Sequence, residues 1–203
     1  MLWPTLAMAD TKVIVALGDS LTHGYGLPPD EGFVPQLERW LVAQGEDVRV
    51  LNAGVSGDTT AGGRARLDWA LAEGADGLIV TLGGNDLLRG IDPANSRANL
   101  DAILTEAGTR GVPVLLVAME APGNYGPEYK AEFDGMYAEL AEIHGALLAQ
   151  SFLAPLMSGV ENPADLARYM QPDGLHPNAE GVALIVDGLG PKVRDLLARG
   201  AGG

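Results

Sequence analysis

Short apolar runs rich in β-branched residues alternate along this chain with longer amphipathic segments. The runs occupy residues 12–17, 47–52, 77–82 and 112–119, and a weaker one occupies 146–150. Apolar runs of this length are typical of strands that are covered on both faces. The alternation therefore predicts an α/β fold, in which an open parallel sheet carries helices on both of its faces.

Helical periodicity fills the intervals between these runs. Phe33, Leu37 and Leu41, for example, recur at four-residue spacing and predict an amphipathic helix. The same reasoning predicts four more helices, over residues 59–71, 93–107, 129–143 and 178–198.

Length and composition limit the domain organisation. The 203 residues are consistent with one domain, and 47% hydrophobic with 20% charged residues is typical of a globular protein. We expect a single domain over 10–199 and a fraying glycine-rich end over 200–203. The chain has no cysteine, which excludes disulfides, thiol nucleophiles and cysteine-based zinc or iron–sulfur sites.

The charge balance limits the partners. Thirteen basic and 27 acidic residues give a net charge of −14, which repels polyanions, so we expect no nucleic-acid partner. No stretch approaches the roughly 18–20 apolar residues that span a bilayer, so we expect no stable membrane insertion. We expect a monomer or weak homodimer that acts on a small molecule.

Residues 1–9 leave two interpretations open. Ala7-Met8-Ala9 has the small-x-small form of a signal-peptidase site, but the basic region that opens a signal peptide is missing. The segment is either a disordered or packed tail, or the remnant of a signal peptide. The second interpretation predicts a periplasmic or secreted protein, whereas the first leaves a cytoplasmic location open.

Polar, glycine-rich sequences follow the first three predicted strands and precede the last helix. They are Gly18-Asp19-Ser20-Leu21, residues 52–59, Gly83-Gly84-Asn85-Asp86 and Asp173-Gly174-Leu175-His176-Pro177. Ligands bind at the carboxyl ends of the strands in open parallel sheets. The predicted topology therefore lets these four sequences converge on one edge of the sheet.

The converging residues contain what acyl transfer needs. Ser20 can act as the nucleophile, and His176 can take its proton through one ring nitrogen. Asp173, three residues earlier, can accept a hydrogen bond from the other nitrogen. The backbone N–H groups of Ser20 and Gly57 and the side-chain amide of Asn85 are candidate donors to an oxyanion.

In this order, the four sequences resemble the four blocks of the GDSL, or SGNH, hydrolase family, over residues 12–197. The match is closest to its thioesterase I, lysophospholipase L1 and arylesterase branch, on residues 52–60, 82–90 and 124–126. The resemblance implies a flavodoxin-like three-layer αβα sandwich with five parallel strands. It also implies a Ser20, Asp173 and His176 triad and an oxyanion hole from Ser20, Gly57 and Asn85. The Gly-x-Ser-x-Gly elbow of the α/β-hydrolase fold does not occur in the chain.

Apolar residues beside these motifs are candidates for the walls of an acyl pocket. They are Leu21, Leu87, Leu88, Tyr125 and Leu175. Residues 83–91 and 122–129 show no regular pattern, and we expect them to move when an acyl group binds.

Other titratable residues favour structural roles. Asp19 and Asp86 adjoin the site, but no second carboxylate or histidine lies at metal-ligand spacing, so we expect neither a metal nor a cofactor. We expect Asp19 to accept backbone N–H bonds in its turn. We expect His23 to line the entrance to the site and His144 to cap a helix end.

The sequence therefore predicts a serine esterase for short- to medium-chain carboxylic esters, acting through an acyl-enzyme on Ser20. Aryl esters, acyl thioesters and lysophospholipids are the substrates that the resemblance implies. One alternative is a carbohydrate O-acetyl esterase with the same triad, which requires a shallow polar cleft and exposed aromatic residues. Another is a non-catalytic flavodoxin-like binding module, in which Ser20 would not react with a fluorophosphonate.

Overall fold

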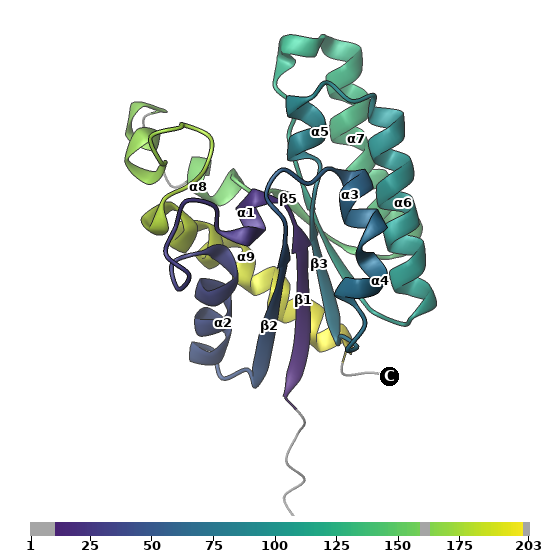
Figure 1. Ribbon diagram of the computed structural model, residues 1–203, viewed down its shortest axis with the longest axis vertical. Helices are drawn as coiled ribbons and strands as arrows, with labels where there is room; N and C mark the ends of the chain where they lie inside the picture. Colours follow the sequence, from purple (N-terminus) through teal and green to yellow (C-terminus); the bar gives the residue numbers. More distant parts are fainter. Residues whose placement is uncertain (1–10, 159–162, 201–203) are drawn as a thin grey trace, which may run out of the picture.

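The centre of the molecule is a five-stranded parallel sheet, seen in a computed structural model that describes residues 11–158 and 163–200 (Figure 1). The strands are β1 (Lys12–Gly18), β2 (Val48–Gly54), β3 (Gly77–Thr81), β4 (Val114–Ala118) and β5 (Leu147–Ser151). Their order is β2-β1-β3-β4-β5, and every neighbouring pair is parallel. The predicted open parallel sheet is confirmed.

Helices cover both faces of this sheet and complete a three-layer sandwich (Figure 1). On one face α2 (Phe33–Ala43) packs against α9 (Ala179–Gly200). The other face carries α3 (Thr60–Ala65), α4 (Leu67–Ala70), α6 (Pro93–Thr109) and α7 (Pro127–His144). Shorter elements lie in the connections: α1 (Ser20–His23), α5 (Gly84–Leu88), α8 (Ala154–Ser158) and two 3₁₀ helices, η1 (Gly123–Tyr125) and η2 (Pro163–Tyr169).

The burial of the strands explains why their apolar runs could be recognised in the sequence. All five residues of β3 are buried, as expected for a strand inside a sheet that is covered on both faces. The edge strand β2 instead alternates between buried and exposed positions over most of its length, which is why its run is the most polar of the first four. Large side chains such as Phe33 and Phe152 fill the space between sheet and helices.

Two local predictions were wrong. The helix predicted over 59–71 is two helices, because Arg66 between α3 and α4 leaves the helical conformation, with φ −113° and ψ 8°. The stretches 83–91 and 122–129, predicted to be irregular, contain helices: α5 in the first, and η1 with the start of α7 in the second. A five-residue helix is too short to show a helical period.

The ends of the chain lie mostly outside the described residues. Residues 1–9, with the pattern resembling a signal-peptidase site, belong to this part. Of the segment 200–203, Gly200 is the last residue of α9 and the other three are not described. Among the described helices, none has both the length and the apolar character needed to cross a bilayer.

Candidate active site

The turn after β1 places Ser20 at the carboxyl edge of the sheet, as the first residue of α1. Asp19 caps this helix, and its Oδ1 accepts the backbone N–H of Leu21 at 3.0 Å. Gly18 has no room for a side chain, because a Cβ would lie 2.0 Å from Thr22 Oγ1 and 2.9 Å from Thr81 O. The glycine therefore lets the turn pack tightly and fixes where the Ser20 hydroxyl stands.

His176 and Asp173 reach Ser20 from the loop before α9. His176 Nε2 lies 2.8 Å from Ser20 Oγ, and His176 Nδ1 lies 2.7 Å from Asp173 Oδ2. The second oxygen of Asp173 accepts the backbone N–H groups of Leu175 and His176, at 2.9 and 3.0 Å. Three residues predicted to act together are thus in one hydrogen-bonded line.

The charge on Asp173 favours His176 as the base that takes the proton of Ser20. The hydrogen bond with His176 lowers the pKa of Asp173 to about 2, with further lowering by the two backbone N–H donors. An ionised carboxylate at this position accepts the proton on Nδ1 and leaves Nε2 as the acceptor that faces the serine hydroxyl.

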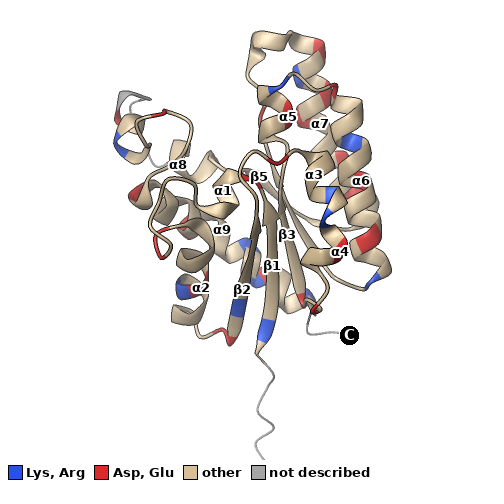
Figure 2. Ribbon diagram, in the orientation of Figure 1, with Lys and Arg blue, Asp and Glu red and all other residues tan. Residues whose placement is uncertain are grey.

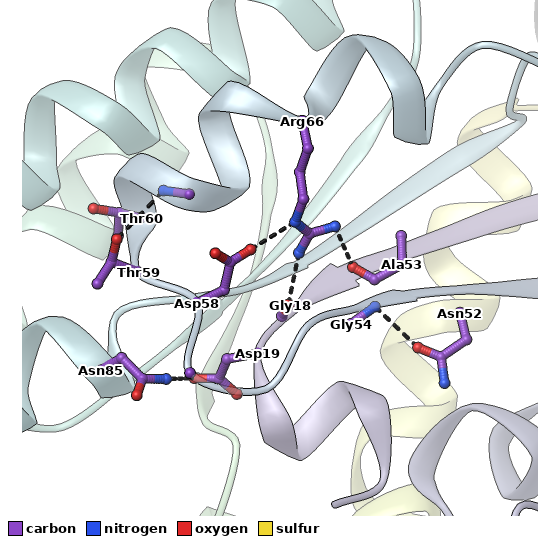
Figure 3. A network of polar contacts seen from close by, with 12 residues as sticks. Gly18, Asp19, Asn52, Ala53, Gly54, Asp58, Thr59, Thr60, Arg66 and Asn85 are labelled. Atoms are coloured by element: carbon purple, nitrogen blue, oxygen red, sulfur yellow. Dashed lines mark hydrogen bonds and ion pairs between the residues drawn. The ribbon is translucent and has the colours of Figure 1, made fainter.

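Asn85, in α5, stands beside the same turn. Its Nδ2 donates to Asp19 Oδ2 at 3.2 Å (Figure 3). The Asp19 carboxyl is buried, and burial raises its pKa to about 6 against the lowering effect of bonds from Leu21 and Asn85. A primary amide has two N–H groups, so Asn85 keeps a second donor that Asp19 does not take.

Gly57 lies in the loop between β2 and α3, with a φ of +83° that favours glycine. Its carbonyl accepts a hydrogen bond from Arg89 Nη2 at 2.8 Å. The structure thus brings Ser20, His176 and Asn85 to one cleft, whereas Gly57 is not among the residues that line it.

Arg66 lies beneath the site and bonds to the strand ends and the loop around it. No sequence motif indicated this residue. Its guanidinium donates to Asp58 Oδ2 at 2.6 Å, Ala53 O at 2.6 Å and Gly18 O at 2.8 Å (Figure 3). These bonds tie the carboxyl ends of β1 and β2 to the loop that carries Gly57. The break between α3 and α4 falls at Arg66, the residue that makes these bonds.

The cleft beside Ser20 has a volume of about 460 Å³. Leu21, Leu87, Leu88, Tyr125 and Leu175, the five predicted wall residues, all line it. Leu87 is buried, whereas Leu88, Tyr125 and Leu175 are exposed and form the rim. The cleft also reaches Asn124, which belongs to the resemblance, and residues outside every motif around the ends of β4 and β5: Met119, Glu120, Pro122, Ser151 and Leu153. Their position at strand ends was the one signal that could have indicated them.

The other titratable side chains near the site are engaged in structure. The buried Asp86 carboxylate accepts bonds from Thr60 N, Thr60 Oγ1 and Ser96 Oγ, and so joins α3, α5 and α6. His23 pairs with Ser56, and His144 ends α7 and pairs with Asp101. Within residues 11–158 and 163–200, no three His, Asp or Glu side chains are grouped so that they could hold a metal ion.

Comparisons with known proteins agree with this geometry. A model of the GDSL-like lipase/acylhydrolase family matches residues 16–184. The chain is 37% identical to esterase TesA of Pseudomonas aeruginosa, over 93% of this chain and 91% of that protein. It is 33% identical to thioesterase 1/protease 1/lysophospholipase L1 of Escherichia coli K12, over 94% of this chain and 86% of that protein.

A solved structure shows the same architecture. The fold superposes on AlinE4, an SGNH-hydrolase family esterase, with a TM-score of 0.74 at 44% identity. The superposition covers 93% of this chain and 98% of that one.

Proposed function

This chain belongs to the GDSL-like lipase/acylhydrolase family, and we propose that it is a serine esterase that works through an acyl-enzyme on Ser20. The observation that carries the proposal is the line from Ser20 Oγ through His176 to Asp173, with contacts of 2.8 and 2.7 Å, beside a cleft lined by leucines. A hydroxyl with a base in contact, and a base with an orienting carboxylate, is an activated nucleophile.

The reaction follows from these contacts. Ser20 Oγ attacks the acyl carbonyl while His176 Nε2 takes the hydroxyl proton, and Asp173 stabilises the imidazolium that forms. The carbonyl oxygen becomes an oxyanion, for which we assign the N–H groups of Ser20 and Gly57 and the free N–H of Asn85 as donors. His176 then gives its proton to the leaving alcohol or thiol, and the C–O or C–S bond breaks.

Water completes the cycle. His176 Nε2 takes a proton from a water molecule that attacks the acyl-enzyme carbonyl, and the second tetrahedral intermediate collapses to release the acid. The proton returns to Ser20 Oγ, so atoms and charge balance over the two half-reactions.

We assign as substrates short- to medium-chain aryl esters and acyl thioesters, with lysophospholipids as a further class. The names of the two relatives, an esterase and a thioesterase/lysophospholipase, support the ester, thioester and lysophospholipid classes, and the leucine-lined cleft supports an acyl chain. The exposed rim residues Leu88 and Leu175 give a longer chain an apolar surface to lie on.

The test is hydrolysis of p-nitrophenyl esters from acetate to laurate by the wild type, Ser20→Ala and a control, Ser158→Ala. Ser158 lies in α8, and its hydroxyl contacts only Pro155 O among the described residues. We expect one chain length to be preferred, Ser158→Ala to match the wild type, and Ser20→Ala to lose on the order of 10³-fold or more of the rate. Retained turnover by a folded Ser20→Ala protein overturns the proposal.

Acetylated sugars belong in the same assay, because a carbohydrate O-acetyl esterase would use the same triad. Faster turnover of these sugars than of any p-nitrophenyl ester would move the assignment to that class. Labelling of Ser20 by a fluorophosphonate separates both esterases from a non-catalytic binding module.

We propose further that the protein is exported and acts as a monomer or weak homodimer. The Ala7-Met8-Ala9 pattern supports export. Mass spectrometry of the N-terminus of protein from its native cells tests the first point, and light scattering across a concentration series tests the second.

A further inference from the structure

The bond between Ser20 and His176 joins residues 156 positions apart, and neither lies in a strand. Ser20 opens the four-residue helix α1, and His176 lies in the loop between η2 and α9. The sheet therefore does not by itself set the 2.8 Å contact. Some other link must hold the two segments together.

Gln171 provides such a link through its side chain. Its Nε2 donates to Tyr25 O at 2.8 Å, in the turn after α1, and to Pro177 O at 3.0 Å, next to His176. Both acceptors are carbonyls, so the amide orientation is settled by its partners. One side chain thus bridges the serine segment and the histidine segment.

The backbone of Gln171 is anchored in the same place. Its N–H donates to His176 O at 2.8 Å, and its carbonyl accepts the N–H of Gly174 at 3.0 Å. Asp173 lies inside the turn that this second bond closes, residues 171–174. The side-chain amide nitrogen and both backbone polar groups of Gln171 therefore bond to the loop that carries His176 or to the turn after Ser20.

These bonds close a ring around the catalytic pair. The N–H of Tyr25 donates to Ser20 O at 3.1 Å, Gln171 joins Tyr25 to the histidine loop, and His176 returns to Ser20 Oγ. The ring of Tyr25 also packs on the imidazole of His176, with centroids 4.8 Å apart. Loss of the Gln171 bond to Tyr25 would open this ring between the Ser20 turn and the histidine loop.

Gly26 makes room for this bridge. Its φ is +76°, and a Cβ built on it would lie 2.1 Å from Gln171 Oε1. A side chain at this position would push the Gln171 amide away from Tyr25. Tyr25 thus supplies the acceptor for the Gln171 amide, and Gly26 leaves the space that the amide occupies.

We propose that Gln171 is a positioning residue that holds the His176 loop against the Ser20 turn and so sets the distance for proton transfer. The inference rests on the proposed function, because it gives Ser20 and His176 their roles. It predicts an effect on the chemical step rather than on substrate binding, since Gln171 is not among the residues that line the cleft.

The test substitution is Gln171→Met, which keeps the length of the side chain and removes its donors. We expect kcat to fall roughly tenfold to a hundredfold, because small misplacements of catalytic groups cost this much. We expect KM for the best p-nitrophenyl ester to stay within about twofold. The rate constant for fluorophosphonate labelling should fall with kcat, while the labelled fraction at completion stays at the wild-type level.

Gln36→Met is the matched control. The Nε2 of Gln36 also bridges two backbone carbonyls, Glu31 O at 2.6 Å and Ala179 O at 3.1 Å, and the side chain is likewise half-buried. Neither of these two acceptors lies in the Ser20 turn or in residues 171–177. This variant should lose stability but keep the wild-type kcat.

Gly26→Ala tests the same bridge from the other side. It should lower kcat as Gln171→Met does, and the double variant should lose no more than the stronger single one, because both remove one interaction. Wild-type kcat in Gln171→Met overturns the inference, and so does a loss of rate matched by a lower labelled fraction. The proposed function fails separately, through activity that persists in Ser20→Ala.

Discussion

At the scale of single residues, Asp19 is a carboxyl whose burial raises its pKa. It lies directly before the nucleophile, 2% exposed, and accepts one bond from Leu21 and one from Asn85. Asn85 is the side chain to which we assign an oxyanion contact. The buried carboxyl thus fixes the turn that carries Ser20 and, on its other oxygen, the amide beside it.

Asp19 makes stability depend on pH. Its pKa is about 6 in the folded protein against 3.8 in the unfolded chain, so from about pH 4 to 6 only the folded state keeps the proton. Stability therefore falls as pH rises through this window, by about 3 kcal/mol for a shift of about two units. In Asp19→Asn this contribution is absent.

Urea unfolding at several pH values between 4 and 7 measures the effect. The stability of Asp19→Asn minus that of the wild type should rise by about 3 kcal/mol over this range, since the other groups are common to both proteins and cancel. A difference that does not change with pH would show that the pKa of Asp19 is the same in the folded and unfolded states.

At the scale of elements, Arg66 ties the ends of two neighbouring strands to the loop before α3. It binds Gly18 at the end of β1, Ala53 near the end of β2, and Asp58 in the loop before α3. The side chains of Arg66 and Asp58 are 18% and 16% exposed, so their ion pair is largely withdrawn from water. Removing one partner of such a pair leaves the other charge without compensation.

We predict that Arg66→Met lowers the free energy of unfolding by about 3 kcal/mol, because Asp58 and two strand-end carbonyls lose their donor. Arg97→Met is the control, since the Arg97–Glu139 pair has 37% and 64% exposed side chains and should cost less than about 1 kcal/mol. Denaturant unfolding of both variants provides the comparison. Equal losses would mean that the Arg66 bonds add no more than a surface pair.

The elements also show what could be predicted from the sequence. Burial on both faces leaves long apolar runs, so the strands and their carboxyl edge were predictable. Ser20, Asp173 and His176 were predictable because their chemistry demands particular residue types. Gln171 and Arg66 were not, because several of their partners are backbone carbonyls, which every residue supplies. The residue types at these carbonyl positions therefore do not indicate the bonds.

At the scale of the whole molecule, the net charge of −14 is the dominant property. Figure 2 shows the acidic residues spread over the helices and loops, and none of the five strands contains one. Near the site, Asp173 is bonded to His176, and Glu120 lies at the cleft, where Lys130 Nζ pairs with it at 3.3 Å. The field therefore repels an anionic substrate on its way to Ser20 and leaves a neutral one unaffected.

This difference predicts how salt acts on two thioesters with the same acyl chain. Octanoyl-CoA carries phosphates, whereas the octanoyl thioester of N-acetylcysteamine is neutral. The Debye length shrinks from about 30 Å at 0.01 M salt to about 10 Å at 0.1 M, so added salt screens the repulsion. Raising NaCl from about 10 to 150 mM should increase kcat/KM for octanoyl-CoA about fivefold or more and leave the neutral thioester within about twofold.

The neutral thioester is the control for any effect of salt on the enzyme itself. If both substrates respond equally, salt acts on the fold or on the apolar cleft, and the net charge does not govern substrate capture. If octanoyl-CoA reacts faster at low salt, the local field at the cleft is positive despite the net charge. Arg89, which lies on α5's carboxyl side and holds Gly57, would then be the cation to replace first.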